Sequence, residues 1–409
     1  MWNLARGIPL YWHLALDTTI THFFTIYLAH GGHFALAAAV STGDSLLKLV
    51  FAVAGSAVAA RTGLPTRVAW CRYLRPALAV AWLAAISLLY SEGSDLLVIT
   101  AVIAFKVVLL VDGAFSADFP FVAQQAFALD LTQSASIQNI IWRGSLAVAP
   151  AFALSIVNRD VDIFYFVPVI VVLLGLSLFA LQSVDETVLE SGSAERSESD
   201  DVRSKRLFSS VMRNRLMRWG LVYQLVVNFA FGGVTYLLIV ELKPTSNIAL
   251  NGISALYLLF FVYQIAVMLM GDGAIPVTRL GGIVGIVALT AGLTIAIGSC
   301  TNFWLDITLC SSMGLLYAFE LGAVQKVLIS KLKGPQYLSY SALSKVCARL
   351  SSAASVAMLG FGVAMGVSPS SLLIMCGVVG LFGALLLKLC VPQASGRVAS
   401  AQMSNEGGA

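Results

Sequence analysis

The chain has 409 residues, of which 58% are hydrophobic and only 11% are charged, and its mean hydropathy is +0.87. Soluble proteins carry about 25% charged residues. A soluble chain this apolar would expose large apolar patches and aggregate, whereas a lipid bilayer requires such a composition. The composition therefore excludes a soluble domain and predicts a membrane protein.

Apolar stretches long enough to cross the hydrocarbon core, which takes about 20 residues, recur along the chain. We predict about twelve transmembrane helices near residues 8–29, 38–60, 73–91, 94–115, 137–157, 163–182, 219–241, 252–272, 280–299, 304–327, 340–365 and 371–392. Most connections are short, so neighbouring helices form antiparallel hairpins. The predicted fold class is an all-α polytopic membrane protein.

One long polar segment, residues 184–218, divides these spans into six plus six. It is acidic and Ser-rich and then basic, which is typical of a flexible linker. A shift of about 211 residues lays span 1 on span 7, as in transporters built from parallel repeats. We predict two pseudo-symmetric six-helix bundles at 1–183 and 219–392, with the linker between them and a cytoplasmic tail at 393–409.

The distribution of Lys and Arg predicts the orientation in the membrane. With the N-terminus in the cytoplasm, the inner segments hold 18 of the 25 basic residues, the outer segments hold only Arg159 and Lys243, and the spans hold the rest. Both termini are therefore expected in the cytoplasm. The net charge of +4 reflects this topology and gives no indication of nucleic-acid binding.

Ionisable side chains inside spans are costly and usually face a cavity or a partner. His13 and Asp17 lie four residues apart on one face of span 1, and the repeat places Gln224 and Asn228 at the matching depth of span 7. We interpret these positions as a central cavity in which the Asp17 carboxylate takes up and releases a proton. The alternative is a hydrogen-bonded contact between helices.

Further polar and charged residues lie inside spans 2, 4 and 7. Lys106, near the middle of span 4, could meet Asp17 across the cavity or attract an anionic group of a substrate, and Tyr223 is expected to line the cavity. Asp44 and Lys48, four residues apart, are expected to neutralise each other within span 2.

Ion pairs are predicted at the cytoplasmic side of each half. Asp112 and Arg143 lie at similar depths in spans 4 and 5, and Glu320 and Arg349 repeat this pattern in spans 10 and 11, with Lys345 one turn before Arg349. We interpret them as gating pairs that form in one state and part in the other. Static pairs that only neutralise buried charge are the alternative.

No metal, cofactor or enzyme chemistry is indicated. His13 and His22 would face opposite sides of one helix, and His30 and His33 fall in a short loop. The six cysteines form no close pairs, and the chain has no phosphate-binding loop and no catalytic spacing.

The segment from Ala54 to Leu78 resembles the loop between spans 2 and 3 of the major facilitator superfamily. Arg61, Gly63 and Arg67 fit the motif, while Ala60 stands at its Asp position. The second-half counterpart keeps Asp272 and Arg279. In span 5 the run around Gly144 and Pro150 resembles the antiporter signature, and the stretch before it resembles macrolide-efflux proteins and the enterobactin exporter.

The resemblance implies alternating access by two rocking six-helix halves, usually driven by protons. The sequence thus favours proton-coupled export of a small amphipathic natural product, such as an antibiotic or a siderophore or other metallophore. The expected setting is a monomer in the bilayer of a bacterial inner membrane, with no cofactor. An importer of a metabolite or siderophore with the same fold, and a transport-dead sensor or scaffold, are the alternatives.

The topology can be checked with single cysteines placed in residues 184–218. We expect a membrane-impermeant thiol reagent to label them only from the cytoplasmic side. Labelling from outside in intact cells would contradict the orientation.

Overall fold

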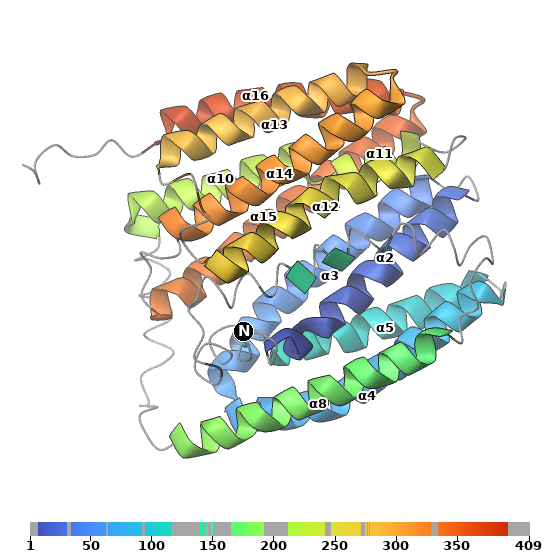
Figure 1. Cartoon of the computed structure of the whole chain (residues 1–409), viewed down its shortest axis with the longest axis vertical. Helices are drawn as coiled ribbons and strands as arrows, with labels where there is room; N and C mark the ends of the chain where they lie inside the picture. The colour runs from blue at the N-terminus through green and yellow to red at the C-terminus, as the bar shows by residue number, and fades with distance from the viewer. Residues whose placement is uncertain are drawn as a thin grey trace, which may run out of the picture.

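In the computed structural model every described element is a helix (Figure 1). The structure describes residues 7–30, 34–62, 64–91, 95–116, 119, 127, 137, 140–141, 144–145, 149, 165–191, 212–241, 247–270, 275, 277, 279–328 and 334–391. The elements are η1 (Ile8–Tyr11), α2 (Trp12–His30), α3 (Phe34–Arg61), α4 (Leu64–Tyr90), α5 (Asp95–Phe115), α8 (Phe166–Ser191), α10 (Arg215–Phe231), α11 (Val234–Glu241), α12 (Asn247–Met270), α13 (Leu280–Ser299), α14 (Phe303–Val327), α15 (Gly334–Ala364) and α16 (Pro369–Leu389).

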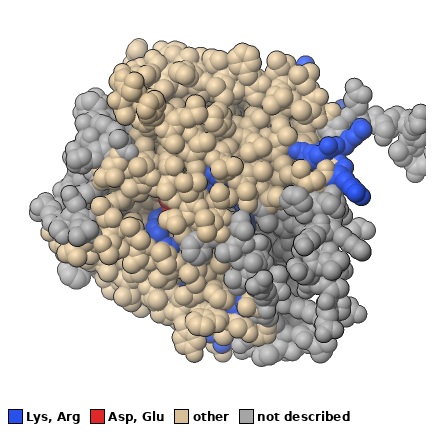
Figure 2. Space-filling model, turned by 180° about the vertical axis from the view of Figure 1, so that it is seen from behind, with Lys and Arg blue, Asp and Glu red and all other residues tan. Residues whose placement is uncertain are grey.

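These helices coincide with all the predicted spans except the fifth, which lies mostly outside the described residues. By length and composition, eight candidate membrane spans occur in the described part of the chain. Large apolar side chains such as Val80, Phe179 and Leu389 are exposed on the helix surfaces. Figure 2 shows one face that carries few charges, with Lys and Arg gathered mainly toward one edge. Such a surface suits contact with lipid tails.

Local sequence signals account for several helix ends. Asn214 caps α10, because its side chain accepts hydrogen bonds from the backbone N–H groups of Leu216 and Met217, and Ser368 caps α16 in the same manner. Between α15 and α16, Gly366 adopts φ +82°, a conformation that favours glycine. A further break separates α10 from α11 at Gly232 and Gly233, so the predicted seventh span is interrupted there.

The helices fall into two groups in space (Figure 1). Helices α2 to α8 lie on one side and α10 to α16 on the other, and α3 packs extensively against α15 across the boundary. We call the end of the molecule at which α2 begins the near end, and the opposite end the far end. The exact boundaries of two domains stay a prediction.

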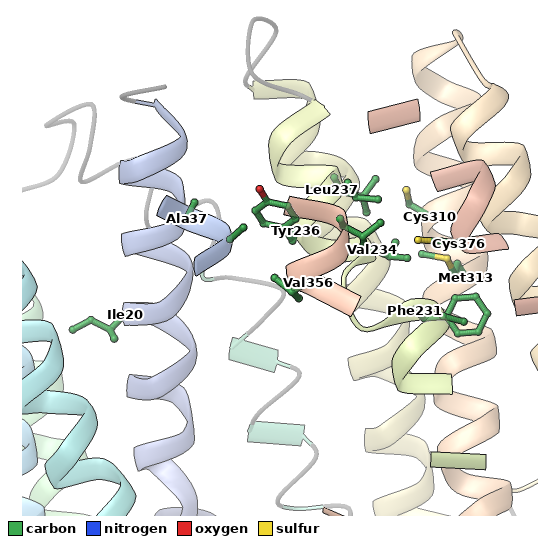
Figure 3. Packing of buried hydrophobic residues seen from close by; sticks show 14 of the residues in the cluster. Ile20, Ala37, Phe231, Val234, Tyr236, Leu237, Cys310, Met313, Val356 and Cys376 are labelled. Carbon is green, nitrogen blue, oxygen red and sulfur yellow. The ribbon is translucent and has the colours of Figure 1, made fainter. Parts of the chain in front are cut away.

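The two groups make a close contact at the far end. A Cβ atom added to Gly360 of α15 would lie 2.2 Å from the Cβ of Ala38 in α3 and 3.7 Å from the hydroxyl of Tyr236 in α11. Nearby, Ala37 and Val356 are buried (Figure 3). Glycine at position 360 leaves room for this close approach of the two groups at the far end.

Gly360→Ala should therefore force α3 and α15 apart at the far end, because a methyl group and a backbone-fixed Cβ cannot occupy the same space. Overpacking of this kind costs about 1–3 kcal/mol. We expect a lower melting temperature in detergent and lower transport activity. The matched control is Gly285→Ala in α13, where an added Cβ meets nothing within 4 Å; equal effects of the two changes would contradict the close contact.

Candidate functional site

A network of four charged side chains joins α2, α3 and α5 inside the first group of helices. The Lys48 ammonium lies 2.7 Å from Asp17 Oδ2 and 2.7 Å from Asp44 Oδ2. The Lys106 ammonium contacts Asp17 Oδ1 and lies 2.9 Å from Asp44 Oδ1. It is also 2.5 Å from the hydroxyl oxygen of Thr21. Each carboxylate therefore contacts both ammonium groups.

The network is buried and electrically balanced. Lys106 is 7% exposed and Asp17 8%, so neither charge has full access to solvent. Two carboxylates and two ammonium groups sum to zero charge, which lowers the cost of placing them at this depth. Removal of any one charge, or a proton bound to one carboxylate, leaves the other three unbalanced.

This arrangement settles two points that the sequence left open. Lys106 meets Asp17, which was one of the two alternatives for that lysine. The Asp44–Lys48 pair exists, but the expectation that it is self-contained is wrong, because both members also contact groups on neighbouring helices. The proton-coupling role of Asp17 stays a proposal.

A second buried cluster lies closer to the near end. The Arg75 guanidinium of α4 donates from Nε to Asp112 Oδ1 at 2.7 Å, and from Nη1 to the backbone oxygen of Leu10 at 3.0 Å and to Ser177 Oγ at 3.1 Å. His13 Nδ1 lies 3.8 Å from Asp112 Oδ2. Arg75 and Asp112 are completely buried. This cluster ties η1, α4, α5 and α8 together.

The second cluster changes the expected partners of two residues. Asp112 pairs with Arg75, a partner that the sequence did not predict, while the predicted partner Arg143 lies outside the described residues and that pair stays a prediction. His13, expected to line the cavity with Asp17, is buried beside Asp112. The cluster connects four elements to one another in this structure, and the gating role of Asp112 stays a prediction.

In the second group of helices, Glu320 of α14 accepts a hydrogen bond of 2.6 Å from the hydroxyl of Tyr223 in α10. Glu320 is 2% exposed. The predicted pair between Glu320 and Arg349 is not made. Among the described residues, neither Arg349 nor Lys345 forms an ion pair with an acidic side chain, and Lys345 is exposed.

The other residues singled out from the sequence lie in α10 and near the connection between α3 and α4. Asn228 donates to the backbone oxygen of Gln224 at 2.8 Å and to its side-chain oxygen at 3.0 Å, so this polar pair of α10 bonds internally. Arg67 of the motif loop is completely buried. The side chain of Arg61 and the whole of Gly63 lie outside the described residues. No three His, Cys, Asp or Glu side chains of the described ranges gather closely enough to hold a metal ion.

The sequence analysis did not predict a functional or structural role for Arg75. It counted Arg75 only as one of the 18 basic residues on the cytoplasmic side. A signal existed: Arg75 lies just inside predicted span 73–91, and Asp112 lies just inside the matching end of span 94–115. These two spans form an antiparallel hairpin, so the residues lie at equal depth on adjacent helices. The same comparison between neighbouring spans would have found the pair.

The described fold matches solved transporter structures over nearly the whole chain. The E. coli fucose:proton symporter FucP shares 15% identity, with 95% of this chain and 98% of that chain covered and a TM-score of 0.54. The human organic anion transporter MFSD10 shares 14% identity, with 94% and 99% covered and a TM-score of 0.59. The nucleoside transporter NupG shares 10% identity, with 95% and 98% covered and a TM-score of 0.63.

No protein-family model matches the sequence, and no curated protein sequence matches it. At these identities the structural likeness shows the fold alone. The chain has the fold of the major facilitator superfamily transporters, and the predicted fold class, an all-α membrane protein with two helical bundles, is confirmed.

The ion pair between Arg75 and Asp112 can be tested with a double-mutant cycle. Removing one partner of a buried pair costs about 3–5 kcal/mol, so Arg75→Leu and Asp112→Leu should each lower the melting temperature strongly. The double variant should be more stable than the sum of the single effects predicts. The control is Arg213→Leu at an exposed position. Additive effects of the two changes would contradict the pairing.

Proposed function

We propose that this protein is a proton-coupled secondary transporter that exports a small amphipathic natural product, an antibiotic or a siderophore or other metallophore, by alternating access. The observation that carries the proposal is the buried, balanced network around Asp17 in a chain with a transporter fold. Charges inside a membrane are expensive, so a network of this kind in a bundle interior is typical of ion and proton pathways.

Asp17 is the proposed proton carrier. Its carboxylate contacts Lys48 and Lys106, which reach it from α3 and α5. A proton bound to Asp17 neutralises its carboxylate and weakens both ion pairs. The two ammonium groups then share the single remaining carboxylate, that of Asp44. This imbalance favours a different arrangement of the three helices. Protonation is thereby linked to the change between the state that is open to the cytoplasm and the state that is open to the outside.

The distribution of basic residues supports the orientation of the transporter. The near end, where α2 and α4 begin, carries the excess of Lys and Arg and is assigned to the cytoplasm. Both termini then lie in the cytoplasm of a bacterial cell with the protein in its inner membrane. The protein is proposed to act as a monomer.

Export is favoured over import by the span 5 segment around Gly144 and Pro150, which resembles an antiporter signature. An importer of a metabolite or siderophore is the second candidate function, because one structural neighbour is described as a fucose:proton symporter. A scaffold without transport would have no need for the buried charges of α2, α3 and α5.

The proposal is tested in everted membrane vesicles energised to an acidic interior, with the internal pH followed by fluorescence. Candidate antibiotics and metallophores are added one at a time. For an exporter, uptake of one compound in exchange for protons raises the internal pH, and Asp17→Asn should abolish this response while the protein is still produced and folded.

The matched control is Asp306→Asn, the same chemical change in the first turn of α14, which lies at the far end of the molecule. This variant should keep the response. A pH rise that persists in Asp17→Asn would remove Asp17 from the mechanism. A failure of every compound in everted vesicles, together with proton-linked uptake by right-side-out cells, would favour the importer.

A further inference from the structure

An apolar groove lies on the surface of the second group of helices, between α10 and α15. It has a volume of about 350 Å³, within the range of about 300–1,000 Å³ that is typical of small-molecule sites. Its lining residues are Leu225, Val226 and Phe229 of α10 and Leu350, Ser351 and Ala354 of α15. The one lining hydroxyl, that of Ser351, donates to the backbone oxygen of Cys347 in its own helix. The groove therefore suits a hydrocarbon chain.

The groove opens toward lipid and away from the first group of helices. Leu225 is 40% exposed and Leu350 is 51% exposed, and Ala354 is exposed as well. Gly360 marks the side of α15 that meets α3. At about 100° per residue, the three groove residues of α15 lie about 80–180° around the helix from Gly360. Acyl chains of the bilayer can therefore enter the groove from its open side.

The groove lies at the depth of the acyl chains. Helix α16 borders it, because a Cβ atom added to Gly383 would lie 2.3 Å from Cγ1 of Val226. With a rise of about 1.5 Å per residue, Leu225 and Phe229 lie about 10 and 16 Å deeper than Arg218 along α10. One leaflet of the hydrocarbon core is about 15 Å thick. The groove thus matches the position of one acyl chain in the leaflet at the near end.

Two exposed arginines stand in line with the groove at the near end. Arg215 and Arg218 lie in the first turns of α10, which has no acidic residue in its first turn. At about 100° per residue, Arg218 lies within about 20° of the directions of Leu225 and Phe229, and Arg215 lies within about 20° of that of Val226. Two cations at a helix N-terminus oppose the helix dipole, so a bound anion would be stabilised by both the cations and the dipole.

We propose that this groove and the two arginines bind an anionic phospholipid of the leaflet at the near end. One acyl chain lies in the groove between α10 and α15, and the phosphate lies against the guanidinium groups of Arg215 and Arg218. A guanidinium can donate two parallel hydrogen bonds to one phosphate, and basic sites between membrane helices recognise anionic headgroups. This inference adds a lipid partner, and it depends neither on the substrate nor on the direction of transport.

The test is equilibrium binding to the purified full chain in a neutral detergent, with the melting temperature as the readout. Dioleoylphosphatidylglycerol and dioleoylphosphatidylcholine carry the same chains, but only the first has a net negative charge. We expect phosphatidylglycerol to raise the melting temperature at lower mole fractions than phosphatidylcholine does. Inorganic phosphate, which has the charge without the chains, should have no such effect. Equal effects of the two lipids, or of phosphate and phosphatidylglycerol, would overturn the proposal.

The contribution of the arginines is measured with Arg215→Gln/Arg218→Gln. This variant should need about tenfold more phosphatidylglycerol or more for the same shift in melting temperature, because each basic residue near a headgroup contributes to the binding of an anionic lipid. A response equal to that of the unchanged protein would contradict the headgroup site.

The matched control is Lys345→Gln/Lys388→Gln, which also removes two exposed cations of the near end. Both lie on helices beside the groove but face away from it. Lys345 lies about 120–180° around α15 from the groove residues, and Lys388 lies about 140° around α16 from Gly383. This control should keep the response to phosphatidylglycerol, and an equal loss in the control would show a general effect of charge and overturn the proposal.

The acyl-chain part is tested by filling the groove. Ala354→Phe adds a ring at an exposed position that lines the groove, and Ala357→Phe makes the same change at an exposed position of α15 outside it. Only Ala354→Phe should weaken the response to phosphatidylglycerol, and equal responses of the two variants would contradict the groove site. If Ala354→Phe instead converts a dimer to a monomer and leaves the lipid response unchanged, a second copy of this chain occupies the groove and the proposal is wrong.

Discussion

The ion pairs among Asp17, Asp44, Lys48 and Lys106 connect three helices at a depth where water cannot compensate a lone charge. Each carboxylate contacts two ammonium groups from different helices, so the positions of α2, α3 and α5 depend on the charge state of the set. In a low-dielectric interior, a single added proton changes that balance. A bundle built around such a set is sensitive to protons in a way that an apolar core is not.

The two groups of helices differ in how their buried charged side chains are paired. In the first, buried carboxylates pair with buried cations, both in the Asp17 network and between Arg75 and Asp112. In the second, Glu320 accepts a hydrogen bond from a neutral hydroxyl, and Arg349 makes no ion pair with a described acidic side chain. We therefore propose that proton coupling resides in the first group.

The helices themselves were predictable, because the thickness of the hydrocarbon core fixes the length of an apolar run. Which charged side chains pair with one another was less predictable. The pseudo-repeat suggested that Glu320 and Arg349 pair as Asp112 and Arg143 would, but a repeat in helix order does not fix which side chains meet. The Arg75–Asp112 pair required a comparison of depth across a hairpin, and the Lys48 contact with Asp17 required knowledge of how the helices are rotated.

The most direct test of the central claim is infrared difference spectroscopy of the purified protein in lipid, recorded as the pH is lowered and as a transported compound is added. We expect a protonated-carboxyl band that forms with acidification, responds to the compound and is absent in Asp17→Asn. A set of carboxyl bands that is identical in the unchanged protein and in Asp17→Asn would show that Asp17 does not carry the proton, and would contradict the account.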